Sequence, residues 1–258
     1  MNGNIKTGFM YFIEGIKMLN EPGIRTFVII PLLLNTVIFF SVISMLGYYF
    51  VESLDYLISK LPEWLSFLYW IIFPLFVSVL LFISGYFFNT IINIIGAPFN
   101  GFLAQKTEEL LTGEIVQDSN SFRDIIAVIP HSLKRELDKI VYYIPRVLVL
   151  FIITFIPGLN VISPFAWFVM GAWMLSIQYS DFPMDNNRVD FSEMKSLLKE
   201  QRLTSIGFGI AVVAALSIPV VNFLVMPAAV IGATIMWVDI HKNKHQKNMQ
   251  INTRIQES

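Results

Sequence analysis

The chain contains no cysteine, so disulfide bonds and thiolate chemistry are excluded. Charged residues are scarce, at 14 % of 258 residues, where soluble domains carry about 25 %. The formal net charge is −1, which leaves no basic excess for binding nucleic acid. Together with a hydrophobic share of 55 %, this composition predicts an integral membrane protein.

Patterns that would indicate catalysis or a metal site are also missing. The sequence has no H-E-x-x-H, no G-x-S-x-G and no P-loop, so we expect no enzymatic activity, no metal and no cofactor. His241 and His245 have the i, i+4 spacing of helical metal ligands, but no Glu or Cys completes a ligand set. We therefore expect 239–258 to be a solvated tail.

Four long apolar runs lack titratable side chains. They are 27–50, 64–105, 147–180 and 203–238. Proton-coupled pumps usually carry a titratable group at membrane depth, so this absence disfavours an embedded proton relay and a buried salt-bridge lock. Backbone dipoles, Asn side chains and rim charges such as Arg25 and Arg146 remain, and these suit an anion.

The first two runs predict complete membrane spans. The run 27–50 would be about 36 Å long as a helix, against about 30 Å of hydrocarbon in a bilayer. The run 64–105 is too long for one span, and we expect Pro74 and Gly96-Ala97-Pro98 to divide it, leaving a second span over about 74–95. The polar stretch 51–63 would connect the spans.

The last two runs resemble each other. Each carries I-P-x-x-N near its middle, at Ile156–Asn160 and Ile218–Asn222, followed by a second proline and small residues. We interpret them as a weak repeat of helical hairpins over 147–180 and 203–238. Two full spans need about 40 residues plus a turn, so we expect both hairpins to be re-entrant and to enter the membrane only partly.

The remaining segments are more polar. The stretch 5–19 has the apolar periodicity of an amphipathic helix and is expected to lie in the membrane interface. We expect 106–143 to face water, with an amphipathic helix interrupted near Pro130, and 181–202 to be a polar link. The result is an all-α protein forming one membrane domain over 1–258.

Charge placement predicts the orientation of the chain. Of its 18 Lys and Arg residues, only Lys60 lies in the loop between the two spans. The positive-inside rule therefore predicts cytoplasmic termini.

One candidate anion site precedes the first span, at Gly23, Ile24, Arg25 and Thr26. A helix N-terminus offers unpaired N–H groups and a positive dipole end, and an Arg beside them makes a plausible oxyanion site. The alternative is a turn before a membrane helix, with Arg25 as an interfacial anchor.

A second candidate is a stripe of amides on one helix. It consists of Asn89, Asn93 and Asn100. Polar amides within a membrane helix need partners or water, so these side chains either line a pore or form hydrogen bonds between helices.

Several segments, in one order, resemble the CysZ family of bacterial sulfate permeases. They are Gly8–Gly15, Glu21–Arg25, Pro31–Asn35, Gly96–Ala104, Tyr143–Arg146, Ala172–Asn186, Met226–Thr234 and Met236–Asp239. The resemblance extends from about residue 8 to residue 245, nearly the whole chain.

The resemblance implies a bacterial inner-membrane protein that brings sulfate into the cell for assimilation into cysteine. It also implies a homo-oligomer embedded in membrane lipid, with two long membrane helices and two hairpins that enter the membrane only partly. The family binds sulfate at the positions that match Gly23, Ile24, Arg25 and Thr26, although many members have a second Arg where this chain has Thr26.

Two other functions stay open from the sequence. The first is a non-transporting membrane scaffold or regulatory partner, for which 106–143 and 181–202 would be the docking surfaces. The second is a membrane enzyme, which the lack of a catalytic set disfavours.

Overall fold

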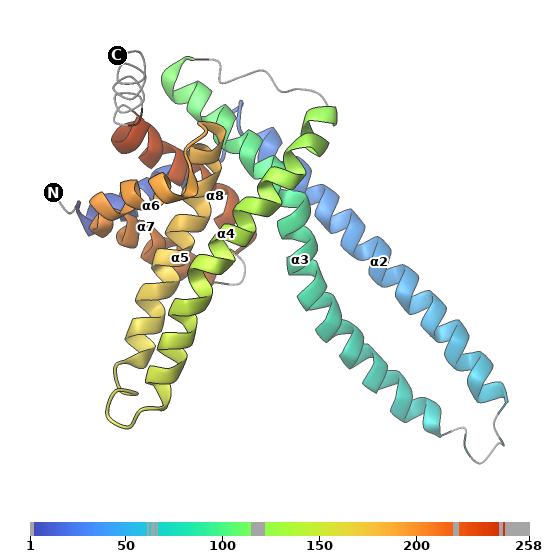
Figure 1. Ribbon diagram of the computed structural model, residues 1–258. Helices are drawn as coiled ribbons and strands as arrows, with labels where there is room; N and C mark the ends of the chain where they lie inside the picture. Colours follow the sequence, from blue (N-terminus) through green and yellow to red (C-terminus); the bar gives the residue numbers. More distant parts are fainter. Residues whose placement is uncertain are drawn as a thin grey trace. The chain divides into compact units, whose positions relative to one another are not determined.

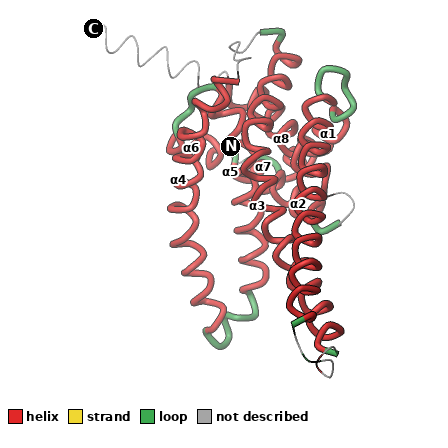
Figure 2. Tube along the Cα trace, turned by 90° about the vertical axis from the view of Figure 1, so that its right-hand side faces the viewer, coloured by secondary structure: helices red, strands yellow, loops and turns green. Residues whose placement is uncertain are grey.

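All regular structure in the described part of the chain is helical (Figures 1 and 2). The computed structural model describes residues 3–60, 62, 65, 67–114, 122–218, 222–242 and 245, without the side chains of 31, 32, 34, 35, 81–98, 122–133, 222 and 223. The elements are α1 (Ile5–Met18), α2 (Arg25–Ser59), α3 (Leu68–Thr112), α4 (Phe122–Phe155), α5 (Ser163–Asn186), α6 (Phe191–Glu200), α7 (Arg202–Leu216), α8 (Asn222–Met236) and η2 (Trp237–Lys242). The predicted all-α class is confirmed.

The chain divides into two compact units, which are described separately. Unit 1 comprises Met1–Val28 and Pro98–Ser258, and unit 2 comprises Ile29–Ala97. The division runs through α2 and α3, so each of these helices contributes to both units.

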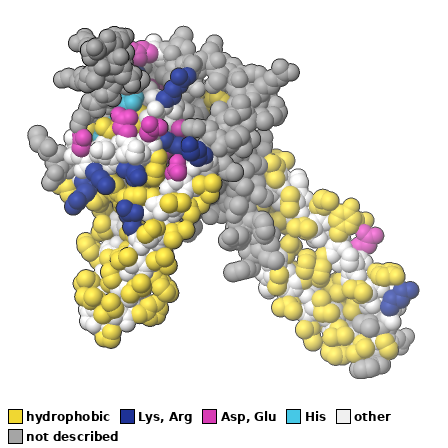
Figure 3. All heavy atoms as spheres, in the orientation of Figure 1, with side chains coloured by type: hydrophobic (Ala, Val, Ile, Leu, Met, Phe, Trp, Pro, Cys, Tyr) yellow, Lys and Arg dark blue, Asp and Glu magenta, His cyan; other side chains and the backbone are white. Residues whose placement is uncertain are grey.

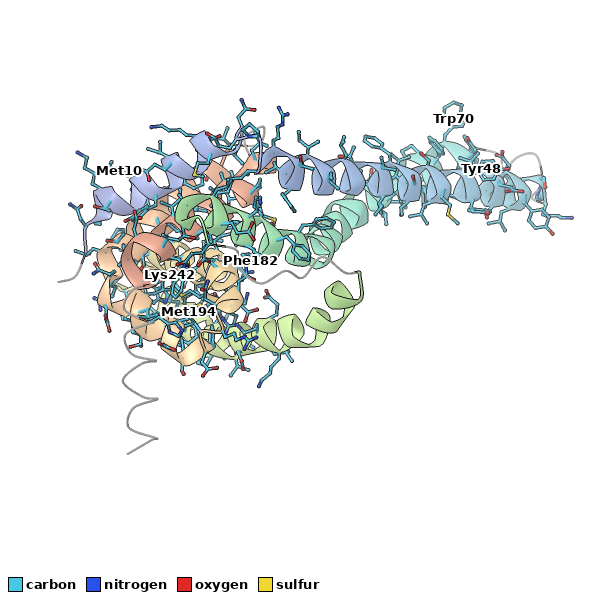
Figure 4. All side chains as sticks on the ribbon, turned by 90° about the horizontal axis from the view of Figure 1, so that it is seen from above. Met10, Tyr48, Trp70, Phe182, Met194 and Lys242 are labelled. Atoms are coloured by element: carbon cyan, nitrogen blue, oxygen red, sulfur yellow. The ribbon has the colours of Figure 1, made fainter. Side chains whose placement is uncertain are left out.

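In unit 2, α2 is longer than the sequence predicted. It runs past the end of the expected span 27–50 and includes most of the expected connection 51–63, so the prediction of a polar connection is wrong there. The stretch 51–60 contains no Pro or Gly, so no helix-breaking residue ends the helix before Ser59. The segment Thr36–Ser59 is long and apolar enough to cross a membrane, and only 6 % of it is buried. Figure 4 shows Tyr48 and Trp70 at the surface of unit 2, with exposed fractions of 67 % and 78 %.

The break expected in the second run is also wrong. The helix α3 continues through Pro74 and through Gly96-Ala97-Pro98 to Thr112. A proline removes one backbone hydrogen bond, and a long helix can retain its course around that loss. The predicted span 74–95 therefore lies within α3, although its side chains beyond Leu80 fall outside the described residues.

In unit 1, α1 packs closely on α7 and α8 through glycines. A Cβ on Gly15 would overlap the Ala228 carbonyl oxygen, and a Cβ on Gly232 would lie 2.6 Å from the Tyr11 carbonyl oxygen. The helix therefore buries a face that includes Gly15, Tyr11 and Phe12 and leaves Ile16 exposed. Met10 lies on the outer side of α1 (Figure 4), and 48 % of it is exposed.

Replacing Gly15 by Ala should separate α1 from α8. The added methyl group has no room against the Ala228 carbonyl, so the variant should lose about 1–3 kcal/mol of unfolding free energy. The matched control is Gly171→Ala on α5, where a Cβ meets nothing within 4 Å and Ala is the better helix former. Thermal unfolding in detergent measures both variants, and equal midpoints would contradict the packing described for α1.

The helices α4 and α5 form the first of the two expected hairpins. The helix α4 is not interrupted at Pro130, which corrects that prediction, and its turn to α5 falls at the expected Ile156–Asn160. Gly158 occupies the left-handed region with φ 88°, a conformation that glycine adopts readily. The Trp167 Nε1–H donates to Thr154 Oγ1 at 3.1 Å and joins the two helices.

Hydrophobic side chains cover the tip of this hairpin (Figure 3). Phe155 and Phe165 are 71 % and 73 % exposed, and the tip residue Val161 is 79 % exposed. The second expected hairpin, formed by α7 and α8, is more enclosed, because Leu224–Lys242 is 67 % buried within the structure. By length and composition, this segment is also long and apolar enough to cross a membrane.

Candidate functional site

The predicted anion segment lies at the start of α2, within unit 1. Arg25 is the first residue of the helix, and the preceding Ile24 is fully buried in the hydrophobic core. A Cβ on Gly23 would lie 3.2 Å from a methyl carbon of Leu110, so the glycine fits closely under α3. Ile24 thus anchors the segment, while the side chains of Arg25 and Thr26 are exposed.

The backbone donors of this segment are only partly available. The N–H groups of Ile24 and Arg25 both donate to the Glu21 carbonyl oxygen, at 2.9 and 3.0 Å. The Ile24 N–H is therefore not free for an anion, which narrows the predicted donor set. Within the described residues, the available donors are the N–H groups of Gly23 and Thr26, the Thr26 hydroxyl and the Arg25 guanidinium, which forms no ion pair there.

Of the three residues in the amide stripe, the structure describes the side chain of Asn100 only. Asn100 is buried, and its Nδ2–H donates to the sulfur of Met226 on α8 at 3.3 Å. This contact is a hydrogen bond between helices, the alternative left open by the sequence. The side chains of Asn89 and Asn93 lie outside the described residues.

A buried ionic cluster that the sequence did not predict joins α4 to α5. Arg135 Nη2 lies 2.6 Å from Asp181 Oδ1, and Lys139 Nζ lies 3.0 Å from Asp181 Oδ2. Arg135 also lies 3.3 Å from Asp185, and Lys139 lies 2.6 Å from Glu136. The side chain of Lys139 is only 2 % exposed. The cluster lies outside the four apolar runs, so it does not touch the expectation made for them, but it corrects the expectation that 106–143 faces water.

The arrangement of α4 explains why the cluster was missed. Its apolar residues point outward, with Leu137 57 % and Val141 69 % exposed, whereas Arg135 and Lys139 point inward. In a soluble protein the apolar face of an amphipathic helix would be the buried one, and here it is the exposed one. The i, i+4 spacing of the two cations and the position of Asp181 directly after an apolar run were the available signals.

A second ionic cluster closes the C-terminal end of unit 1. Lys242 Nζ lies 3.2 Å from Glu108 and 2.9 Å from Glu114, and the Nδ2–H of Asn187 donates to Glu108 at 2.7 Å. Glu108 is fully buried, and Lys242 lies among the helices of unit 1 (Figure 4). Lys242 thus pairs with one carboxylate within α3, Glu108, and one just after it, Glu114. The cluster therefore joins η2 to the C-terminal end of α3.

The expected solvated tail is wrong for its two histidines. His241 is 1 % exposed in η2, and His245 Nδ1 lies 2.9 Å from the Glu193 carboxylate. The Trp237 ring lies beside both imidazoles, with centroids at 6.5 and 6.0 Å. Both histidines therefore belong to the packing of unit 1.

The Glu114–Lys242 contact should make the free energy of unfolding depend on pH in the acid range. The hydrogen bond and charge of Lys242 lower the pKa of Glu114, so the contribution is complete above the unfolded-state pKa and is lost as pH falls through the folded-state pKa. The stability difference between wild type and Glu114→Gln should be largest at neutral pH and should vanish in acid. Unfolding midpoints across pH measure it. The matched control, Glu52→Gln on the exposed face of α2, should show no such trend.

The exposed apolar segment of α2 and the apolar hairpin tip are typical of an all-helical membrane protein. Residues 11–227 match the family described as Sulfate transporter CysZ/Etoposide-induced protein 2.4. The chain is 43 % identical over 238 residues to the sulfate transporter CysZ of Pseudomonas fluorescens (strain Pf0-1), covering 92 % of this chain and 95 % of that protein. The chain belongs to this family, which confirms the resemblance found in the sequence.

Proposed function

We propose that the chain transports sulfate into the bacterial cell across the inner membrane, for assimilation into cysteine. The observation that carries the proposal is the similarity to a named sulfate transporter over almost the full length of both chains. The exposed donors at the start of α2 support it independently, because a sulfate dianion needs several hydrogen-bond donors.

We place the sulfate-binding site at Gly23, Ile24, Arg25 and Thr26. Transfer of a bare dianion into hydrocarbon would cost tens of kcal/mol, so transport requires donors that replace water. The Arg25 guanidinium presents a planar fork that fits two oxygens of a tetrahedral oxyanion. The N–H groups of Gly23 and Thr26 and the Thr26 hydroxyl add donors, while Ile24 contributes by anchoring the segment in the core.

The membrane arrangement is part of the proposal. The exposed apolar segment of α2 crosses the bilayer, and the hairpin of α4 and α5 enters it only partly. Partial entry is supported by the length of the uncharged part of α4. That part runs from Val147 to Phe155 and is about 14 Å long, against about 30 Å of hydrocarbon in a bilayer. We extend partial insertion to α7 and α8, place both termini in the cytoplasm and propose a homo-oligomer in lipid. Within α3, Asn89 and Asn93 remain candidates for a pore lining.

A growth experiment tests the proposal in the cell. A bacterial strain without its own sulfate uptake systems should grow on sulfate as the sole sulfur source when it expresses this chain. Growth on cystine is the control for viability and expression. Growth on cystine alone, with the protein present in the membrane, would overturn the proposed function.

A further inference from the structure

The ring of Tyr142 on α4 forms a fixed platform between three helices of unit 1. The Trp173 Nε1–H of α5 donates to the Tyr142 hydroxyl at 3.1 Å. The Phe191 ring of α6 meets the Tyr142 ring edge to face, with centroids 6.0 Å apart and an interplanar angle of 82°. The hydroxyl and the ring of Tyr142 are therefore both held in place by neighbouring helices.

Two cations share this one ring. The guanidinium carbon of Arg146 lies 3.6 Å from the Tyr142 centroid, and Lys195 Nζ lies 5.1 Å from it. Lys195 also lies 4.5 Å from the Phe191 centroid. Neither cation forms an ion pair with a carboxylate in the part of the chain that the structure describes, unlike the buried pairs of Arg135 and Lys139.

These cations keep most of their hydrogen-bond donors available. A guanidinium has five N–H groups, and Arg146 uses Nη1 to donate to the Tyr142 carbonyl oxygen. The guanidinium lies over the ring, and its remaining N–H groups can form a bidentate contact with an oxyanion. Arg146 is exposed and Lys195 is partly exposed, so an anion can reach both.

The platform lies where the apolar hairpin begins. Arg146 is the last charged residue before Val147, and the apolar part beyond it exposes residues such as Phe151, at 54 %. Figure 3 shows Lys and Arg side chains where the hydrophobic tip joins the rest of unit 1. Tyr and Trp are typical of the headgroup level of a membrane, and Tyr142 and Trp173 occupy this boundary.

We propose that Arg146 and Lys195, held on the Tyr142 ring, bind the headgroup phosphate of an anionic phospholipid. The apolar hairpin beside the cations gives the acyl chains a surface, which a free sulfate or phosphate ion would not use. Two cations without a carboxylate partner favour a headgroup of net negative charge and repel the ammonium of a zwitterionic one. The inference rests on the partial insertion proposed above and adds a lipid site distinct from the segment at Arg25.

Lipid retention by the purified full-length protein tests the site. Cells are grown with radiolabelled phosphate, and labelled phosphatidylglycerol is counted per protein after extensive washing in detergent. The double variant R146Q/K195Q should retain about tenfold less lipid than wild type, because it loses two charge-assisted contacts. The matched control is Lys199→Gln, which changes an exposed lysine one turn further along α6 and should retain lipid like wild type.

Each other outcome overturns a defined part of the inference. Equal retention by wild type and the double variant refutes the site, as does displacement of the lipid by millimolar sulfate, which would indicate a free oxyanion site. If the double variant does not fold, the wild-type protein provides the test. Its unfolding midpoint should rise when phosphatidylglycerol is added and should not change when phosphatidylcholine is added. Sulfate uptake measured on the same wild-type protein separates failure of this site from failure of the proposed function.

Discussion

Replacing Arg25 by Ala should reduce sulfate binding and uptake by roughly 10- to 100-fold. A hydrogen bond to a charged group contributes about 1.5–3 kcal/mol, and each 1.4 kcal/mol corresponds to about a tenfold change in affinity. Arg25 is exposed and forms no ion pair within the described residues, so its loss removes a ligand contact without breaking an internal one. Isothermal titration with sulfate and uptake into proteoliposomes measure the two effects.

Two further variants separate the role of Arg25 from its charge. Arg25→Lys keeps the positive charge but loses the planar fork, so it should retain part of the binding. Arg202→Ala removes an exposed arginine at the start of α7 and should bind sulfate like wild type. If Arg25→Ala and Arg202→Ala both behave like wild type, Arg25 is an interfacial anchor and the site assignment is wrong.

The second large effect concerns the buried cluster between α4 and α5. Asp181→Asn leaves Arg135 and Lys139 without their shared carboxylate, and both cations are nearly inaccessible to water. Removing one member of a buried ion pair leaves an uncompensated charge, so we expect a loss of about 3 kcal/mol of unfolding free energy. The remaining contacts of these cations to Asp185 and Glu136 limit the loss.

Unfolding in detergent, followed by circular dichroism, measures this loss. The matched control is Asp190→Asn, because Asp190 is exposed at the start of α6 and its side chain caps no N–H group there. The double variant K139M/D181N should be less destabilised than the sum of the single variants, since it removes both partners of one pair. A midpoint for Asp181→Asn equal to that of Asp190→Asn would show that the cluster contributes little to stability.

Local signals in the sequence predicted several features correctly. The Pro-Gly pair at 157 and 158 marked the turn between α4 and α5, because glycine adopts the left-handed conformation that this turn contains. The apolar run predicted to start a helix at residue 27 lies in a helix that begins two residues earlier, at Arg25. These features depend on neighbours along the chain, which a single sequence displays.

Long-range pairing was not predictable in the same way. Arg135 and Asp181 are 46 positions apart, and although local signals mark each as a candidate, none of them pairs the two residues. The prolines led to helix breaks being predicted where none occur, since Pro98 and Pro130 lie within continuous helices. Proline raises the cost of a helix locally, but the length of apolar helix on both sides decides whether the helix continues.

For the proposed anion site, the sequence identified a segment but not which of its backbone donors are free. Arg25 and Thr26 are exposed as an anion site requires, but the Ile24 N–H donates to Glu21, a bond that the sequence could not reveal. The sequence left two roles open for the amide stripe, and the Nδ2–H of Asn100 donates to Met226 on another helix, as the second role requires. In both cases the missing information was which partner occupies a donor.

The central claim is that this chain alone moves sulfate, and radiolabelled sulfate uptake into proteoliposomes holding only this protein tests it most directly. Uptake is measured with and without an imposed proton gradient, since the apolar runs carry no titratable group for proton coupling. The account predicts saturable, sulfate-selective uptake that does not require the gradient. No uptake under either condition, from protein shown to be folded, would contradict it and favour a scaffold that acts through a partner.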